Sequence, residues 1–286
     1  MAPPARLRVL LLTSGDRPEL ARAAQDLLPQ VSQYAHAELA DLTSTGDLSQ
    51  IVFDLAMVLG GDGSILRCAY LMGTNQRPVV GINLGKLGFL ADLSLDELRA
   101  QLPGICSGTL PVIEHLMFDC TVERKGEVIQ RQLGLNEMAV FAGPPFSVLE
   151  VDLYVDSELV TSYSCDGLIV STPVGSTAHS LSAGGPILRK DLQAFVVSPI
   201  SPHTLTNRPV VDSADRVYEL VVTRPNPGTS AVADGRVIAL LEPEDRVRIE
   251  RAKVRFKLLA VPGHNYYRTL REKLGWGGRL RQGPNC

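Results

Sequence analysis

The first hundred residues alternate short apolar runs with segments of helical spacing. The run LAMVL at 55–59 is apolar at every position, which is typical of a strand buried on both faces of a sheet. Ser94 and Glu97 have the spacing of a helix capping box. We predict strands at 7–12, 35–42, 55–59 and 78–82, and helices at 18–28, 64–72 and 94–102. This alternation predicts a parallel α/β layer.

The pattern changes after 103–108, where alternating β-branched residues replace helical spacing. Strands are predicted at 118–123, 148–155, 167–171, 217–222 and 247–256. Helical spacing returns at 266–276, through Tyr267, Leu270 and Leu274. We therefore expect an α/β N-terminal domain over 1–105 and an all-β sandwich C-terminal domain over 106–260. A tail over 261–286 is expected to pack back on the N-terminal domain.

Composition excludes several classes of protein. The chain has 286 residues, 45% of them hydrophobic, and a formal net charge of −3, so we expect no nucleic-acid partner. No apolar run reaches membrane-spanning length, and the N-terminal run is too short for a signal peptide, so no membrane partner is expected. Five scattered cysteines, an odd number without a CxxC pair, argue against a disulfide framework or a zinc site. We expect reduced thiols and a cytoplasmic protein.

The apolar run at 55–59 ends in Gly60, Gly61, Asp62 and Gly63. Glycines let a backbone approach a ligand closely, and the N–H groups of a following helix attract an anion. These glycines therefore predict a phosphate-binding turn, with Asp62 able to accept a proton from an attacking hydroxyl. The alternative is a tight strand-to-helix turn in which Asp62 is the N-cap. A Walker A motif is absent, because Leu87 follows the Gly-Lys pair of GINLGKL where Ser or Thr is required.

A second polar segment lies at 166–186, DGLIVSTPVGSTAHSLSAGGP. Its hydroxyl groups could bind a polyhydroxylated or phosphorylated ligand. The alternative is a polar loop followed by a helix that Ser176 or Thr177 caps. Asn136-Glu137, between two apolar runs, either meets a ribose diol or forms a polar pair in a turn. Asp234-Gly235 predicts a hairpin turn.

Several motifs together resemble the NAD kinase family of the bacterial type. The matching segments are LGGDGSILR at 59–67, GINLGKLGFLAD at 81–92, LNE at 135–137, DGLIVSTPVGSTAHSLSAGGPI at 166–187, SPISPHTLTNRPVV at 198–211, DG at 234–235 and KLGWG at 273–277. The resemblance implies a two-domain fold and phosphorylation of NAD by ATP at the 2′-hydroxyl of the adenosine ribose. It also implies Mg²⁺ bound with ATP, and a homodimer or homotetramer with the dinucleotide partly between subunits.

Site residues follow from the resemblance position by position. Asp62 matches the proposed general base, and Gly60, Gly61 and Gly63 match the phosphate-facing loop. The other ligand-binding positions implied are Arg67, Phe89 on the adenine side, Asn136 and Glu137 at a ribose, Asp166 beside the nicotinamide half, Thr177, Ala178, His179, Ser180, Leu181 and Ser182 along the dinucleotide, and His203 and Arg236 at its margin.

Four departures from the family pattern accompany these matches, the mildest being Ser64 in place of the commoner Thr. His179 replaces the usual Tyr, Ser164 stands where several relatives have Arg, and Arg236 stands where several have Gln or another polar residue. His and Tyr are both planar, but His titrates near neutral pH. Two alternatives remain open: a kinase of the GGDG kind that acts on a lipid or sugar, and a non-catalytic NAD(H)-binding module. The sequence does not distinguish ATP from polyphosphate as the donor, or NAD from NADH as the acceptor.

Overall fold

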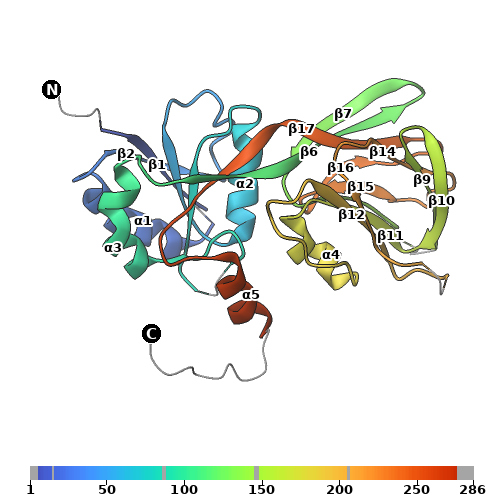
Figure 1. Ribbon diagram of the computed structural model, residues 1–286. Helices are drawn as coiled ribbons and strands as arrows, with labels where there is room; N and C mark the ends of the chain where they lie inside the picture. The colour runs from blue at the N-terminus through green and yellow to red at the C-terminus, as the bar shows by residue number, and fades with distance from the viewer. Residues whose placement is uncertain (1–5, 15, 86–87, 145–147, 205–206, 276–286) are drawn as a thin grey trace, which may run out of the picture. The chain divides into compact units, whose positions relative to one another are not determined.

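A computed structural model describes residues 6–14, 16–85, 88–144, 148–204 and 207–275. The chain divides into two compact units. Unit 1 comprises Met1–Ile113 and Lys257–Cys286, and unit 2 comprises Glu114–Phe256. Strands β6 (Val112–Arg124) and β17 (Arg246–Leu259) run from one unit into the other (Figure 1). No helix among the described residues is long and apolar enough to cross a bilayer.

Unit 1 is built on a parallel sheet in the order β17-β4-β3-β1-β2, with β5 beside β4. Its strands are β1 (Arg8–Thr13), β2 (His36–Asp41), β3 (Leu55–Leu59), β4 (Val79–Asn83) and β5 (Leu93–Ser94). Its helices are α1 (Pro18–Val31), α2 (Asp62–Met72), α3 (Leu95–Cys106) and α5 (Tyr266–Leu274). β3 and β4 are buried at every position, because helices cover both faces of this sheet.

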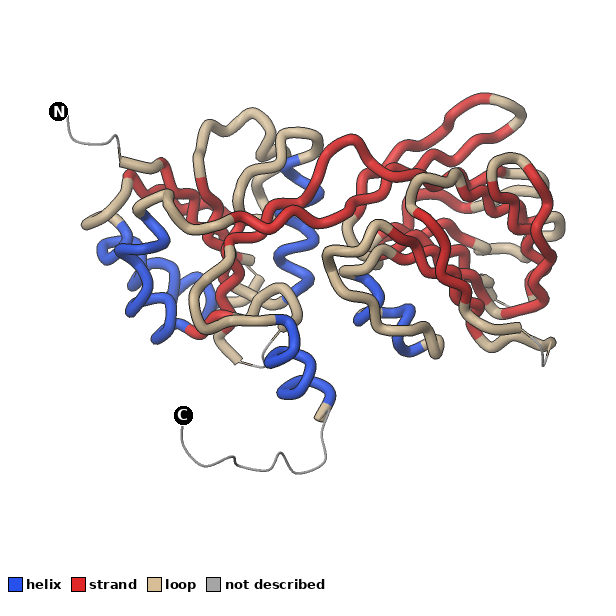
Figure 2. The backbone as a smooth tube through the Cα atoms, in the orientation of Figure 1, coloured by secondary structure: helices blue, strands red, loops and turns tan. Residues whose placement is uncertain are grey.

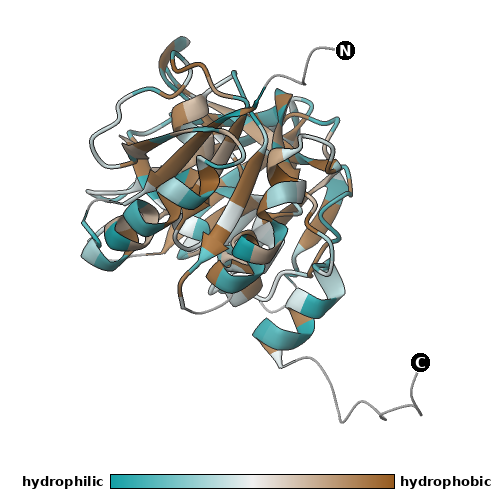
Figure 3. Cartoon of the chain, turned by 90° about the vertical axis from the view of Figure 1, so that its left-hand side faces the viewer, coloured by the Kyte–Doolittle hydropathy of each residue, from teal (hydrophilic) through white to brown (hydrophobic). Residues whose placement is uncertain are grey.

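The helices of unit 1 form two layers around the sheet. α1 and α3 pack their apolar faces, including Leu27 and Leu102, against Leu11 and Met57. α2 lies on the opposite face of the sheet (Figure 1). Figure 3 shows the apolar strands behind helices whose outward faces are hydrophilic. This arrangement places the N-terminus of α2 directly after the carboxyl end of β3, where open α/β sheets bind ligands.

Unit 2 is a β-sandwich, and Figure 2 shows that strands and loops make up nearly all of it. One antiparallel sheet has the order β13-β12-β11-β8-β15-β16, and the other contains β10-β9-β14-β17. The remaining strands are β6, given above, and β7 (Glu127–Gly134), β8 (Glu137–Phe141), β9 (Leu149–Val155), β10 (Glu158–Cys165), β11 (Gly167–Ser171), β12 (Ala194–Ile200), β13 (Val210–Ser213), β14 (Tyr218–Val222), β15 (Ser230–Ala233) and β16 (Arg236–Leu240). Alternate residues of both sheets, such as Val140, Leu168 and Leu220, share one core. The predicted fold class is therefore confirmed.

Most of the predicted elements are present. The strands at 55–59 and 167–171 have the predicted bounds, and the capping box of α3 is formed by Ser94 and Glu97. The helix predicted from Ser64 begins at Asp62, so Asp62 lies in the first helical turn and Gly61 is the N-cap. The helix predicted at 266–276 is α5, which ends at Leu274; Trp276 lies outside the described residues.

The structure excludes one of the local alternatives. Ser176 and Thr177 do not cap a helix: Gly175–Thr177 form a 3₁₀ turn, and a separate four-residue helix, α4 (His179–Ser182), follows. The Ser176 hydroxyl donates to the Pro173 carbonyl and accepts from the Leu188 N–H. Its side chain is therefore engaged inside the segment and is not available to a helix end.

Candidate active site

The glycine-rich turn of unit 1 leaves open space at the N-terminus of α2. Gly60 has φ of 152°, and a Cβ there would overlap the Ser64 side chain, so this position requires glycine. A Cβ at Gly61 or Gly63 would meet nothing within 4 Å. Packing therefore does not explain these two glycines, and the space beside them leaves the first-turn N–H groups open to a ligand.

The Asp62 carboxylate is held by the backbone of a distant loop. Oδ2 accepts the Phe89 N–H at 2.8 Å, and Oδ1 accepts the N–H groups of Leu90 and Ala91 at 2.8 and 3.0 Å. A Cβ at Gly88 would overlap Oδ1, so glycine at this position lets the loop approach the carboxylate. The GGDG and GKLGF motifs thus form one structure in which Asp62 has a single fixed orientation.

A lysine from the C-terminal helix reaches the same carboxylate. Lys273 Nζ lies 3.8 Å from Asp62 Oδ2 and 4.4 Å from the centroid of the Phe89 ring. Both the Lys273 and the Asp62 side chains are 27% exposed. Phe89, predicted on the adenine side, is buried, with Lys273 over one face of its ring.

Arg67 lies on α2 and donates its Nε to the Leu42 carbonyl at 2.5 Å.

In unit 2, three strand ends bring a second group of predicted residues together. β8 pairs with β11 on one side and β15 on the other, so Asn136 and Glu137 meet the segment after Ser171 and the turn after Ala233. The Asn136 carbonyl accepts the Thr172 N–H at 2.8 Å. A Cβ at Gly175 would overlap that carbonyl, which explains this glycine in the hydroxyl-rich segment.

Asp234 holds the beginning of β8 in place. It forms the predicted hairpin turn with Gly235, and both residues have positive φ, 47° and 76°. Its carboxylate also accepts the N–H groups of Leu135, Asn136 and Glu137 at 2.8, 2.8 and 3.1 Å. Burial raises the pKa of Asp234, and these three hydrogen bonds and the Arg236 charge oppose the rise.

Glu137 is buried without a full set of partners. Its Oε2 atom has no hydrogen-bond partner among the described residues. Burial, followed by the nearby Asp234 charge, raises the pKa of Glu137 to about 8, and a hydrogen bond from the His179 backbone opposes the rise. A buried polar atom without a partner is costly, and such atoms are typical of places where a ligand completes the hydrogen bonding.

The segment from Thr177 to Ser182 passes over the outer face of this sheet. The Thr177 hydroxyl donates to the Val174 carbonyl, and the buried Ser180 hydroxyl lies 3.0 Å from that of Ser198. The exposed His179 ring stacks on Phe141, with centroids 5.2 Å apart and an interplanar angle of 25°. Ala178 joins the 3₁₀ turn to α4, in which Leu181 is partly buried and Ser182 exposed.

Asp166 and His203 form a separate pair. His203 Nε2 lies 3.8 Å from Asp166 Oδ1, and both side chains are about half exposed. Asp166 directly precedes β11, whereas Thr172 directly follows it, so the two residues lie at opposite ends of this strand. The pair is therefore at the other end of β11 from Asn136 and Glu137.

Sequence reasoning missed four contributors to these sites: Gly88, Lys273, Asp234 and Phe141. In the sequence, Gly88 is marked only by the motif GKLGF, Lys273 only by KLGWG, and Asp234 only by the Asp-Gly pair. No sequence pattern marks Phe141. The described residues contain no group of three or more His, Cys, Asp or Glu side chains that could hold a metal ion.

Comparison with known proteins agrees with this architecture. Residues 13–110 match the ATP-NAD kinase N-terminal domain, and residues 135–261 match the ATP-NAD kinase C-terminal domain. The chain is 55% identical over 273 residues to an NAD kinase of Rhodopirellula baltica, covering 96% of this chain and 88% of that one.

Two solved structures share the fold. The structure of yeast NADH kinase complexed with NADH has a TM-score of 0.85 and 21% identity, covering 99% of this chain and 95% of that one. An NAD kinase from Archaeoglobus fulgidus in complex with ATP has a TM-score of 0.72 and 26% identity, with 94% and 98% covered. The domain matches and the 55% identity, rather than the fold alone, determine the family. The chain therefore belongs to the ATP-NAD kinase family and is an ATP-dependent kinase of NAD.

Proposed function

We propose that the protein transfers the γ-phosphoryl group of ATP to the 2′-hydroxyl of the adenosine ribose of NAD and releases NADP. The observation that carries this proposal is the buried Glu137 carboxyl, whose Oε2 has no partner among the described residues. A ribose diol supplies hydroxyl donors to such an atom. Asn136, next to Glu137 and fixed by Asp234, completes the ribose-binding pair.

Asp62 is the general base of the proposed reaction. Oδ1 already accepts two N–H groups, whereas Oδ2 accepts only the Phe89 N–H. A carboxylate oxygen has two lone pairs, so Oδ2 keeps one for the proton of the attacking hydroxyl. The three amide hydrogen bonds hold this oxygen in one orientation, which contributes to alignment of the reacting atoms.

The first turn of α2 receives the phosphate groups in this proposal. Its N–H groups and the open space beside Gly61 and Gly63 favour an anion. Mg²⁺ supplies charge neutralisation when bound with ATP. Among the described residues no carboxylate cluster could hold the ion by itself, and Asp62 already accepts three N–H groups. We therefore propose that Mg²⁺ is bound with the nucleotide and is not held by protein ligands alone.

The remaining dinucleotide contacts are proposed from the second group of residues. His179 stacks beside Phe141, Thr177–Ser182 lines the dinucleotide, and Arg236 lies near Asp234. Phe89 is proposed on the adenine side and Arg67 near the ligand. Asp166 and His203 lie at the other end of β11 from Asn136 and Glu137. This separation supports a homodimer or homotetramer in which another subunit holds part of the dinucleotide. The Asp166–His203 pair is proposed to bind its nicotinamide half.

A cytoplasmic location is part of the same proposal. The four described cysteines, Cys68, Cys106, Cys120 and Cys165, are free and buried. Burial raises the pKa of the thiol of Cys68 to about 12, so it has little reactive thiolate at neutral pH. Free buried thiols suit a reducing compartment.

The proposal is tested by NADP formation. The purified chain is incubated with MgATP and NAD, and NADP is followed with an NADP-specific dehydrogenase. ³¹P NMR of the product then locates the new phosphate on the 2′-oxygen. Formation of one NADP for each ADP supports the proposal. NAD binding without NADP formation would establish the non-catalytic alternative instead, and parallel reactions with polyphosphate and NADH determine the donor and acceptor range.

A further inference from the structure

The phosphate site of unit 1 contains an anion where a cation is expected. Asp62 lies in the first turn of α2, beside the space left by Gly61 and Gly63. A carboxylate and a triphosphate repel each other because both are negatively charged. The sequence has no Walker A lysine that would offset this repulsion. Arg67 is the only basic residue in LGGDGSILR, and it donates its Nε to the Leu42 carbonyl.

The C-terminal helix supplies a positive charge at this point. Lys273 Nζ is 3.8 Å from Asp62 Oδ2, which is longer than the 2.7–2.9 Å typical of a charge-assisted hydrogen bond. The ammonium also lies over the Phe89 ring, a contact that uses the ring face and not a lone pair. An ammonium has three N–H donors, so Lys273 keeps donors for a further anion.

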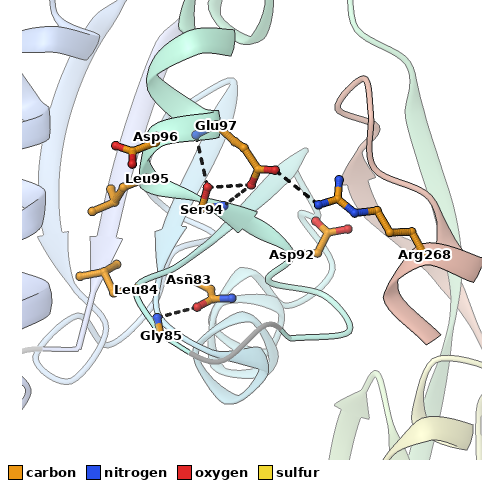
Figure 4. A pocket seen from close by; sticks show the side chains of 9 residues that line it. All are labelled: Asn83, Leu84, Gly85, Asp92, Ser94, Leu95, Asp96, Glu97 and Arg268. Atoms are coloured by element: carbon orange, nitrogen blue, oxygen red, sulfur yellow. Dashed lines mark hydrogen bonds and ion pairs between the residues drawn. The ribbon is translucent and has the colours of Figure 1, made fainter. Parts of the chain in front are cut away.

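The helix that carries Lys273 is anchored to the rest of unit 1. Asn265 caps α5 by accepting the Arg268 N–H, and Thr269 and Leu270 are buried. Arg268 lies 3.8 Å from Glu97 across a pocket of about 280 Å³ (Figure 4). His264 lies 3.6 Å from Asp92 and 3.5 Å from Glu97. Gly275, with φ of 60°, ends the helix two residues after Lys273, so the lysine projects from an anchored last turn.

We propose that Lys273 is a phosphate-binding residue, whose ammonium contacts the β- and γ-phosphate oxygens of ATP at the N-terminus of α2. This inference rests on the proposed function, because it places ATP at that helix end. On ATP binding, the ammonium keeps its contact with the Phe89 face and directs its free N–H donors to phosphate. It also reduces the repulsion between Asp62 and the triphosphate. Lys273 thereby performs, from the opposite end of the chain, the task of a lysine within a phosphate loop.

A purely structural role for Lys273 makes different predictions. Basic residues in the last turn of a helix interact favourably with its dipole, and Arg271 occupies the same turn. If the dipole were the whole explanation, Lys273→Met and Arg271→Met would lower the thermal midpoint equally and leave ATP binding unchanged. Arg271 is exposed and is therefore the matched control.

The test measures MgATP binding to the full chain by calorimetry, without NAD so that no turnover occurs. We expect Lys273→Met to weaken MgATP binding by about tenfold to a hundredfold, the range for loss of a hydrogen bond to a charged group. NAD binding and the Arg271→Met variant are expected to stay within twofold of wild type. Lys273→Arg keeps the positive charge and is expected to retain most of the wild-type affinity for MgATP. If Lys273→Met does not fold, Lys273→Gln is the variant without the charge, and the decisive comparison is between Lys273→Arg and Lys273→Gln.

A double variant separates direct contact from mere neutralisation of Asp62. In the Asp62→Asn background, direct contact predicts that Lys273→Met still weakens MgATP binding by a similar factor. Disappearance of the loss in that background would overturn the inference, as would an equal loss in Arg271→Met. If the wild-type protein forms NADP and Lys273→Met binds MgATP normally, only the role of Lys273 is rejected. Absence of NADP in the wild type rejects the proposed function instead.

Discussion

Asp62 of unit 1 and Glu137 of unit 2 both carry a carboxyl group near the end of a β-strand, but their surroundings differ. Asp62 accepts three backbone N–H groups and faces the Lys273 ammonium. Glu137 has one backbone donor, a neighbouring carboxylate and an oxygen without a partner among the described residues. On the proposed function, the carboxylate that takes part in the chemistry is fixed by hydrogen bonds, whereas the carboxyl group that binds the ribose keeps an oxygen for the substrate.

The largest effect is expected at Asp62. Asp62→Asn keeps the size of the side chain but removes the proton acceptor, so kcat for NADP formation should fall by about 10²–10⁴-fold. The measurement is the steady-state rate with saturating NAD and MgATP. Asp54→Asn is the control, since Asp54 accepts hydrogen bonds from Arg8 elsewhere in unit 1, and its kcat should match wild type. A kcat near wild type in Asp62→Asn would remove Asp62 from the role of base.

The next effect concerns Asp234, which fixes the beginning of β8 for Glu137. Asp234→Ala leaves three N–H groups without their acceptor, and the free energy of unfolding should fall by about 2–3 kcal/mol. Urea denaturation measures the loss. Lys125→Ala is the matched control, because Lys125 also precedes a glycine in a hairpin turn and has positive φ, but its side chain is solvent-exposed. Equal losses in the two variants would mean that only the turn, and not the hydrogen bonding to β8, matters.

A graded effect of pH follows from the raised pKa of Glu137. The folded, ligand-free protein keeps a proton on Glu137 up to about pH 8, whereas the unfolded chain releases it near pH 4.5. Folding therefore binds a proton in this window, so the free energy of unfolding should fall as pH rises from about 5 to 8, by at most about 1.4 kcal/mol per unit. The raised pKa of Asp234 acts in the same direction.

Denaturation at several pH values tests this slope. Glu137→Gln cannot ionise and should flatten the pH dependence, whereas the control Glu150→Gln, at an exposed position of β9, should keep it. An unchanged slope in Glu137→Gln would mean that Glu137 is not the group that binds the proton.

The smallest effect is expected at His179. Tyr is also planar and can stack on Phe141, so His179→Tyr should change the KM for NAD by less than about threefold. His179→Ala removes the stacked ring and should raise that KM further. A steady-state titration of NAD compares the two. An equal KM in His179→Ala and wild type would show that the ring does not contact the dinucleotide.

Local patterns predicted much of the fold. β3 and β11 have the predicted bounds because their apolar runs end at glycines or polar residues, and the Ser94–Glu97 box marked the start of α3. The start of α2 was placed two residues late, because Gly63 is a poor helix former and hides the first turn. The alternative in which Ser176 or Thr177 caps a helix is excluded, because their hydroxyls donate to the Pro173 and Val174 carbonyls.

Contacts between distant segments could not be predicted. Asp62 meets Phe89–Ala91 only because β4 lies beside β3, and it meets Lys273 only because α5 packs in unit 1. Asp234 was correctly predicted in a hairpin turn, but its hydrogen bonds to Leu135–Glu137 depend on the pairing of β15 with β8. Single-sequence patterns specify turn geometry, whereas strand order determines which carboxylates meet which amides.

The division of roles between Asp62 and Glu137 is tested by the dissociation constant of NAD, measured by calorimetry for wild type, Asp62→Asn and Glu137→Ala. We expect Asp62→Asn to bind NAD within twofold of wild type, because Asp62 is proposed to act in the chemical step. We expect Glu137→Ala to bind NAD about tenfold or more weakly, because the ribose loses its partner. Wild-type affinity in Glu137→Ala, or an equal loss in both variants, would contradict the assignment of binding to one carboxylate and chemistry to the other.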